Sequence, residues 1–301
     1  GADAVKFQTF NTENLVSKNT KKAKYQLKND NRKETQFDML KKLELSHQMH
    51  KELMSYCRKK KIIFLSSPFD LESIDFLNSL GLKIFKIPSG EITNFSYLKK
   101  LIKLNKKIIL STGMSNINEV EKAIKILTSQ GTKKKNITVL HCTSEYPTNQ
   151  SNLNLLSIPY LKKKLKMNIG YSDHSNGLLA SWSAVTLGAK VIEKHFTVSK
   201  KLRGPDHKAS LLPNELKDLI NGIRYVETSL GSNKKKPFSV ELKNLKFMRK
   251  FIVANRKIRK GEKFTSNNLI TKRALPGIEA SKWDSIIGKR AKRNFNYDEN
   301  I

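Results

Sequence analysis

The sequence contains few cysteines and no long apolar run. Its two cysteines, Cys57 and Cys142, lie far apart and form no C-x-x-C pair, so neither a disulfide scaffold nor a zinc knuckle is expected. No run of about 18 apolar residues is present, and the opening GADAVKFQTF lacks the basic region and apolar core of a secretory signal. We therefore expect a soluble cytoplasmic protein with no membrane partner.

Acidic residues are scarce. The chain has 26 Asp and Glu against 58 Lys and Arg, which gives a formal net charge of +32. Such a charge suggests nucleic-acid binding, because clustered cations displace counterions from a phosphate backbone. However, lysine far outnumbers arginine, the lysine runs have no interleaved aromatic residues, and base recognition favours arginine. The pattern favours a solvated surface that steers anionic substrates, with no nucleic-acid partner; nucleic-acid binding stays an alternative function class.

Short apolar runs of strand length recur along the first two thirds of the chain. Seven of them lie within residues 4–7, 62–65, 84–87, 108–110, 137–140, 167–170 and 191–193. Amphipathic helical patterns separate the runs, and Gly81, Gly131 and Gly188 stand where helices should end. Strand and helix patterns that alternate at this spacing predict parallel βαβ units.

These units predict a (β/α)8 TIM barrel rather than an open doubly wound sheet. No G-x-G-x-x-G motif follows any run, as a dinucleotide-binding sheet would require. Polar residues of catalytic type follow nearly every run, where barrel enzymes place their active sites. An eighth strand would close the barrel. Because the chain begins at Gly1 within a helix-to-strand pattern, we expect the first barrel strand to be missing from this chain.

A composition change predicts a second domain. The segment GSNKKKP follows Leu230, and beyond about Phe247 the pattern changes to short strands and turns. The sequence predicts a barrel domain over residues 1–232, a linker over residues 233–246 and a small β-rich domain over residues 247–301.

Several strand ends carry groups that suit an anionic ligand. Lys6 and Gln8 end the first run, and Lys86 lies in the third. An ammonium group at a barrel mouth is a candidate ligand for phosphate or carboxylate oxygens. The segments SSPFD, PSGE and STG offer hydroxyl and backbone N–H donors, although serines there also serve as ordinary helix caps.

Two histidines follow the last two runs. His174 lies in SDHS and His195 in EKHF, and neighbouring strands of a barrel would bring the two imidazoles together. With oxygen donors nearby, the pair predicts a labile Mn²⁺ or Mg²⁺ site rather than a structural zinc site. A pair of general bases is the alternative interpretation.

The ordered motifs KFQTF, SSPFD, KIPSGE, LSTGM, LHCTSEYPT, GYSDHS, IEKHFT and GPDHKASL resemble the N-acetylneuraminate synthase family, which includes legionaminic acid synthases. The tail resembles that family's antifreeze-like (SAF) domain, so the resemblance covers essentially the whole chain. It implies a metal-dependent, phosphoenolpyruvate-condensing transferase of carbohydrate biosynthesis.

The resemblance also implies residue roles, position by position. Phosphoenolpyruvate would contact Lys6, Gln8, Lys86, Ser89, Ser111, Ser144 and Ser172. Glu91 and Glu193 would be catalytic, and His174 and His195 would bind the metal. Tyr146, Asp206 and Arg273 would contact the sugar. Arg273 would reach the partner subunit's barrel, which implies a domain-swapped homodimer.

The principal function expected is condensation of phosphoenolpyruvate with N-acetylmannosamine to give N-acetylneuraminate and phosphate. The alternative substrate is 2,4-diacetamido-2,4,6-trideoxymannose, which gives N,N'-diacetyllegionaminate. The CTSEYP form of the motif around Ser144 also resembles the legionaminic acid branch. From a different class, a non-catalytic sugar-binding barrel is kept as a further alternative.

Overall fold

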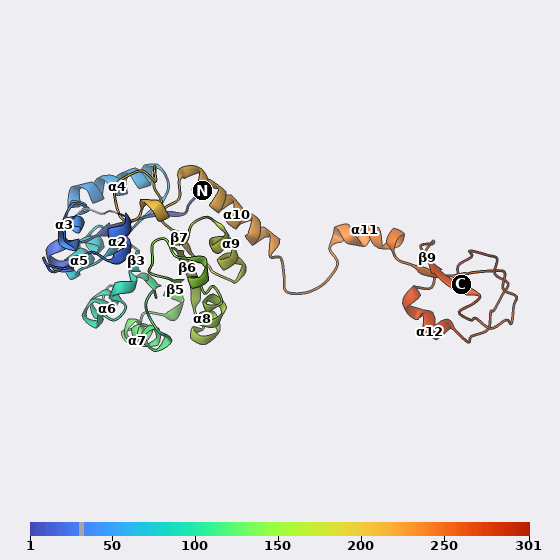
Figure 1. The fold of residues 1–301 in the computed structure, drawn as a ribbon. Coiled ribbons are helices and arrows are strands. Elements are labelled where there is room, and N and C mark those ends of the chain that lie inside the picture. The colour runs from blue at the N-terminus through green and yellow to red at the C-terminus, as the bar shows by residue number, and fades with distance from the viewer. Residues whose placement is uncertain (30–32) are drawn as a thin grey trace. The chain divides into compact units, whose positions relative to one another are not determined.

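A computed structural model describes residues 1–29 and 33–301 of the chain. Within these residues the chain separates into two compact units, Gly1–Gly231 and Ser232–Ile301 (Figure 1). Each unit has a hydrophobic core of its own.

Seven strands, hydrogen-bonded in groups of two and five, line the first unit across its described residues. β1 pairs with β2, β3 to β7 pair in chain order, and every pairing is parallel. β2 also lies against β3, so the strands follow one another around a curled sheet (Figure 1). The predicted TIM-type fold is confirmed. The strands are β1 (Ala4–Thr9), β2 (Ile63–Pro68), β3 (Ile84–Ile87), β4 (Lys107–Ser111), β5 (Ile137–Cys142), β6 (Asn168–Asp173) and β7 (Ile192–Lys194).

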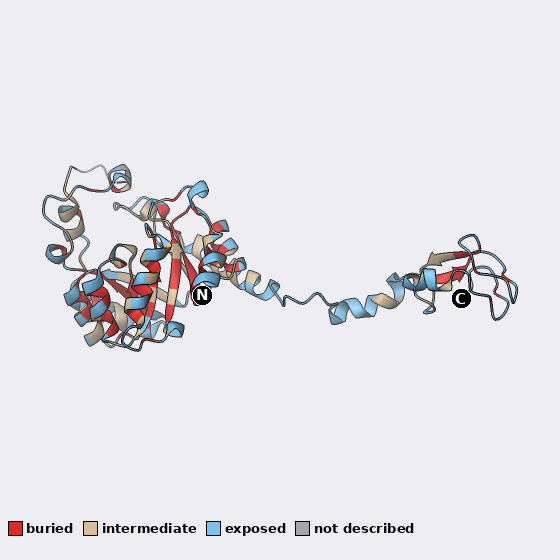
Figure 2. Cartoon of the chain, turned by 90° about the horizontal axis from the view of Figure 1, so that it is seen from below, coloured by how far each residue is buried: buried red, intermediate tan, exposed pale blue. Residues whose placement is uncertain are grey.

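Helices cover the outside of this sheet. Buried residues gather on the strands and on the helix faces turned toward them (Figure 2). Nowhere in residues 1–29 and 33–301 is a helix both long and apolar enough to cross a membrane. The helices are α1 (Thr12–Leu15), α2 (Lys24–Asn29), α3 (Gln36–Lys41), α4 (His47–Lys59), α5 (Leu71–Ser79), α6 (Phe95–Ile102), α7 (Ile117–Thr128), α8 (Ser157–Leu165), α9 (Leu179–Thr186) and α10 (Pro213–Ser229), with short 3₁₀ turns η1 (Ser89–Glu91), η2 (Lys134–Asn136), η3 (Gln150–Asn152) and η4 (His207–Ala209).

Helix α7 illustrates how the sequence determines these elements. Asn116 caps its start, and its side chain and that of Glu119 exchange hydrogen bonds with each other's backbone N–H groups. Val120, Ala123, Ile124 and Leu127 follow the helical period and are buried against the sheet. The chain leaves the helix through Gly131, whose φ of +94° suits glycine.

The second unit contains a small antiparallel sheet. Strands β8 (Phe251–Ala254) and β9 (Leu269–Lys272) pair around a core that includes Ile252, Ile258 and Phe295. The η5 turn (Ala280–Lys282) and α12 (Trp283–Ile286) complete this unit. The prediction of a small β-rich domain at the C-terminus is confirmed. Helix α11 (Ser239–Met248) occupies much of the segment for which the sequence predicts a linker.

Candidate active site

A charged cluster joins side chains from three strands of the first unit, β1, β3 and β7. The Glu193 Oε1 atom on β7 lies 3.4 Å from the Lys86 Nζ on β3 and 3.8 Å from the Lys6 Nζ on β1. The Ser172 hydroxyl donates to the same oxygen at 2.9 Å, and Lys86 donates to the Ser111 Oγ at 2.8 Å. The curled sheet thus brings together five of the predicted residues.

The charge state of this cluster follows from its composition. Burial alone would raise the pKa of the Glu193 carboxyl, but Lys6, Lys86 and the Ser172 hydroxyl outweigh burial and hold that pKa far below its ordinary value. Burial lowers the pKa of the Lys86 ammonium, and the charge of Glu193 offsets part of this shift. Glu193 is therefore an anion at neutral pH. Two lysines against one carboxylate suit the cluster to an anionic ligand.

Small residues at the ends of β3, β4 and β5 form a polar cradle. The Gly113 N–H donates to the Ser89 Oγ at 2.9 Å, and the same Oγ lies 3.4 Å from the Cys142 Sγ. A Cβ placed on Gly113 would overlap the Ser144 hydroxyl and would lie 2.9 Å from the Ser89 Oγ. Hydroxyl and N–H donors that converge in this way suit phosphate or carboxylate oxygens.

The two histidines lie next to each other at the ends of β6 and β7. The ring centroids of His174 and His195 are 5.4 Å apart. The His174 Nδ1 donates to the Thr143 carbonyl oxygen at 2.7 Å, which leaves its Nε2 3.3 Å from the Ser172 Oγ. The His195 Nδ1 lies 3.6 Å from a carboxylate oxygen of Asp206.

Both imidazoles are neutral at neutral pH. Burial lowers the pKa of His174, although its hydrogen bond to Thr143 opposes the shift. Burial, together with the charges of His174 and Lys6, lowers the pKa of His195 to about 3. Each ring can therefore offer a nitrogen lone pair to a cation.

The donor set fits a weakly held divalent cation. In the described part of the chain, no group of three or more His, Cys, Asp or Glu side chains could hold a metal ion. Two neutral imidazoles would leave the remaining ligand positions to substrate or water, as in an open catalytic site and unlike a closed structural zinc site. Mn²⁺ and Mg²⁺ commonly keep water in their coordination shell, so the residues present fit such an ion.

An aromatic wall flanks the histidines. The Tyr146 ring lies 4.2 Å from the His174 ring and 5.5 Å from the His195 ring, measured between centroids. Tyr25 on α2 lies 5.0 Å from Tyr146. Burial raises the pKa of both tyrosines, and that of Tyr25 reaches about 12, so both hydroxyls stay protonated. Burial also raises the pKa of Asp206. The negative charge of Asp206 contributes to the raised pKa of both tyrosines.

Three predicted site residues lie outside these contacts. Gln8 is exposed on β1. Glu91 in η1 accepts a hydrogen bond from the Asn94 Nδ2 at 2.7 Å, and in residues 1–29 and 33–301 no hydrogen bond or ion pair joins it to Glu193. Burial raises the pKa of the Glu91 carboxyl. Arg273 follows β9 in the second unit, where it is exposed.

Ser67 lies in the segment SSPFD but was not among the predicted site residues. It lies opposite Gln8 in the register of β1 and β2 and is 1% exposed. Its Oγ has no hydrogen-bond partner among the described residues. A buried hydroxyl without a partner costs about 1–3 kcal/mol, which makes Ser67 a candidate for hydrogen bonding to a ligand. The only sequence signal that could have distinguished Ser67 from Ser66 is the alternation of side chains between the two faces of β2.

A buried ion pair joins β6 to β7 beside the histidines. The Lys194 Nζ lies 2.9 Å from the Asp173 Oδ2, and both side chains are almost fully buried. The Ser175 and Ser181 hydroxyls each donate to Asp173 at 2.6 Å. Because strand side chains alternate, this pair holds the two strands from the face opposite Ser172 and Glu193. It supports the strand ends that carry both histidines.

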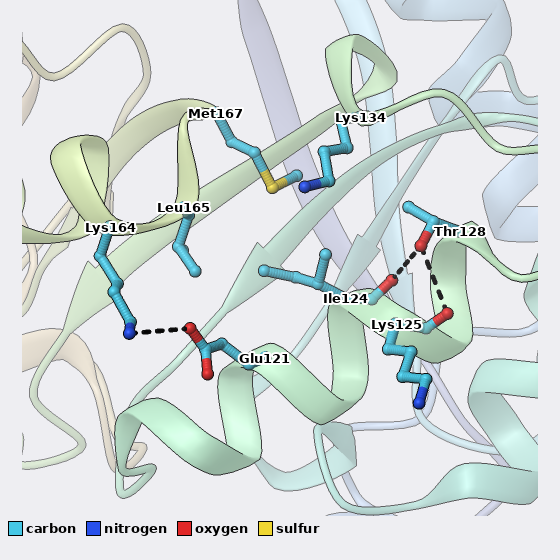
Figure 3. A pocket seen from close by; sticks show the side chains of 8 residues that line it. All are labelled: Glu121, Ile124, Lys125, Thr128, Lys134, Lys164, Leu165 and Met167. Carbon is cyan, nitrogen blue, oxygen red and sulfur yellow. Dashed lines mark hydrogen bonds and ion pairs between the residues drawn. The ribbon is translucent and has the colours of Figure 1, made fainter.

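A separate hollow lies between α7 and α8 (Figure 3). Lys134 precedes β5 and Met167 precedes β6, so the hollow lies at the amino-terminal edge of the parallel strands. One of its lysines, Lys164, pairs with Glu121 at 3.5 Å. Barrel enzymes carry their active sites at the other edge, where the histidines lie. The lining residues are Glu121, Ile124, Lys125, Thr128, Lys134, Lys164, Leu165 and Met167.

Comparison with protein families identifies the family of the chain. The NeuB family model matches residues 1–235, and the SAF domain model matches residues 249–301. The chain belongs to the NeuB family. It is an enzyme, a sialic-acid-type synthase of carbohydrate biosynthesis with a C-terminal SAF domain, as the resemblance of its motifs predicted.

Individual NeuB family relatives differ in the acid for which they are named. The N,N'-diacetyllegionaminic acid synthase of Campylobacter jejuni is 53% identical over 100% of this chain and 90% of the relative. The pseudaminic acid synthase of the same species is 32% identical over 99% of this chain and 86% of the relative. The solved sialic acid synthetase of Leptospira borgpetersenii has a TM-score of 0.72 and 33% identity, covering 81% of this chain and 80% of that one.

Proposed function

We propose that this NeuB family enzyme condenses phosphoenolpyruvate with 2,4-diacetamido-2,4,6-trideoxymannose to give N,N'-diacetyllegionaminate and phosphate. The observation that carries the reaction type is the Lys6–Lys86–Glu193 cluster next to the His174–His195 pair. The sequence predicted N-acetylmannosamine as the principal substrate and this sugar as the alternative. The 53% identity to a legionaminic acid synthase favours the alternative.

The lysine cluster and the polar cradle would hold phosphoenolpyruvate. Its C3 attacks the aldehyde carbon of the open-chain sugar, which forms the new carbon–carbon bond while the aldehyde oxygen takes up a proton. Water then adds at C2, and the C–O bond to phosphate breaks, which leaves a nine-carbon 2-keto acid and phosphate. Holding the reactants side by side lowers the entropic cost, and the fixed charges of Lys6 and Lys86 stabilise developing negative charge.

Glu193 is the best-placed acceptor for the proton of the attacking water. In the absence of substrate its pKa is too low for a base, because two ammonium groups face it. The negative charges of bound phosphoenolpyruvate would offset those lysines, so we expect the pKa of Glu193 to rise when the substrate binds. Glu91 is the second candidate, and its raised pKa is compatible with a proton-transfer role.

His174 and His195 would hold the divalent cation, Mn²⁺ or Mg²⁺. When bound, such a cation would draw electron density from the aldehyde oxygen and make the aldehyde carbon more electrophilic. Tyr146 and Asp206 would contact the sugar beside it. Arg273 would contact the sugar from a partner subunit in a homodimer, a proposal that rests on the family resemblance.

Release of phosphate from phosphoenolpyruvate tests the proposal. The purified protein is assayed with Mn²⁺ and with each of the two sugars, before and after chelation. We expect faster release with the diacetamido sugar and its loss on chelation. Faster release with N-acetylmannosamine would reverse the substrate assignment, and no release with either sugar would favour a sugar-binding barrel.

Replacing His174 with alanine is expected to abolish metal-dependent turnover. One of two protein ligands is lost, so Mn²⁺ affinity should fall by at least the roughly 10–100-fold that loss of a ligand's hydrogen-bond partner typically costs. Calorimetry measures this affinity without turnover. His47→Ala is the matched control, since that exposed ring stacks on Phe76 of α5. Substantial residual turnover in His174→Ala, with unchanged Mn²⁺ affinity, would exclude the metal role.

Replacing Gly113 with alanine is expected to weaken phosphoenolpyruvate binding. The new methyl group would displace the Ser144 hydroxyl and crowd that of Ser89. Loss of one hydrogen bond to a charged ligand costs about 1.5–3 kcal/mol, so the KM for phosphoenolpyruvate should rise about tenfold or more. Gly90→Ala is the control, because a Cβ there meets nothing within 4 Å. An unchanged KM in Gly113→Ala would show that the polar cradle does not bind phosphoenolpyruvate.

A further inference from the structure

Tyr25 lies in the site although its segment is distant from the strand ends. It belongs to α2, in the long connection between β1 and α4, and its ring centroid lies 5.0 Å from that of Tyr146. Tyr146 in turn lies 4.2 Å from His174. A chain of ring contacts therefore runs from the histidine pair outward to α2.

The segment around Tyr25 is fixed by buried polar contacts. Gln26 is 7% exposed, and its Oε1 accepts hydrogen bonds from the Ala23 N–H at 2.8 Å and the Gln36 Nε2 at 3.4 Å. Tyr25 is itself partly buried, and its ring contacts that of Tyr146. The ring is thus held at the site rather than exposed on a free loop.

The site residues form successive layers from the strands outward. Lys6, Lys86 and Glu193 lie within strands, and the two histidines follow strand ends. Tyr146 and Asp206 lie beyond, in the loops after β5 and β7, and Tyr25 lies beyond Tyr146. A sugar whose aldehyde meets phosphoenolpyruvate at the inner layer would extend its carbons 4 to 6 toward Tyr146 and Tyr25.

We propose that Tyr25 is a specificity-determining residue, whose ring packs against the C4 acetamido group and C6 methyl group of the diacetamido sugar. This assignment rests on the proposed function. N-acetylmannosamine shares the aldehyde and the C2 acetamido group but carries hydroxyls at carbons 4 and 6. An aromatic ring gains contact area from the two methyl groups of the diacetamido sugar and none from those hydroxyls.

Kinetics of Tyr25→Ala test the inference. The KM for the diacetamido sugar should rise about tenfold, the discrimination expected for loss of one or two methyl contacts, while kcat stays unchanged. The KM for N-acetylmannosamine and for phosphoenolpyruvate should change less than about twofold. Tyr25→Phe keeps the ring and should keep the preference. Tyr160→Ala, at an exposed tyrosine of α8, is the matched control.

Calorimetric titration of each sugar into the protein, without phosphoenolpyruvate, separates the two proposals. The wild type should bind the diacetamido sugar more tightly, and Tyr25→Ala should remove the difference. Binding of this kind without turnover overturns the proposed function alone. Turnover with equal losses for both sugars in Tyr25→Ala, or a loss in kcat, overturns the role of Tyr25 alone. A wild-type preference for N-acetylmannosamine overturns the substrate assignment and, with it, the role of Tyr25. Absence of both binding and turnover with either sugar overturns both.

Discussion

Replacing Glu193 with glutamine is expected to lower kcat on the order of 10²–10⁴-fold, the usual contribution of a positioned proton acceptor. The amide cannot accept the proton of the attacking water, and it cannot neutralise Lys6 and Lys86. The KM for phosphoenolpyruvate should not rise, because one negative charge is removed from the neighbourhood of an anionic substrate. Steady-state phosphate release, with saturating metal and sugar, measures both parameters.

Two further glutamate variants make this result interpretable. Glu121→Gln removes a carboxylate that pairs with Lys164 at the surface, and it should leave kcat unchanged. Glu91→Gln tests the other glutamate that the sequence predicted as catalytic, which lies in η1 and accepts a hydrogen bond from Asn94. If Glu91→Gln loses more activity than Glu193→Gln, the proton acceptor is Glu91, and the role of Glu193 is limited to positioning the lysines.

Replacing Asp173 with asparagine is expected to destabilise the protein by about 3–5 kcal/mol, because it leaves the buried Lys194 ammonium without its counter-charge. Urea unfolding followed by circular dichroism should show a lower midpoint with an unchanged slope. We also expect loss of activity, since the strand ends that carry His174 and His195 lose their common support.

The control for this substitution is Asp75→Asn. Asp75 pairs with Lys100 at the surface. The Asp75→Asn substitution therefore also removes an aspartate–lysine ion pair, but one that is exposed to solvent. Exposed pairs contribute about 0–1 kcal/mol, and the midpoint should hardly move. An equally small effect for Asp173→Asn would show that the buried pair is not what joins β6 to β7.

Much of the barrel could be predicted because each element carries its own signal. The apolar runs give the strands, and positions such as Val120, Ala123 and Leu127 repeat with the helical period. Glycines with positive φ, such as Gly81 and Gly188, end the helices. The pairing of His174 with His195 was also predictable, because adjacent parallel strands end at the same edge of the sheet.

Other features depend on contacts between segments that are distant in the sequence, and no local sequence pattern predicts them. Tyr25 lies in a polar connection, and only the fold places its ring beside Tyr146. Lys194 resembles the many surface lysines of this chain until the structure pairs it with Asp173. Glu91 and Glu193 were equal candidates in the sequence, and only the structure shows that Glu193 is the one that faces Lys6 and Lys86.

The layered arrangement of the site bears on how such enzymes diversify. The groups that we propose for the three-carbon unit, such as Lys6 and Lys86, lie on strands of the barrel, whose positions the whole core constrains. Those that we propose for the far end of the sugar, such as Tyr146 and Tyr25, lie outside the strands on connections, where substitutions disturb the core least. Inheritance can therefore keep the bond-forming chemistry while the accepted sugar changes, and relatives named for legionaminic, pseudaminic and sialic acids on one scaffold agree with this division.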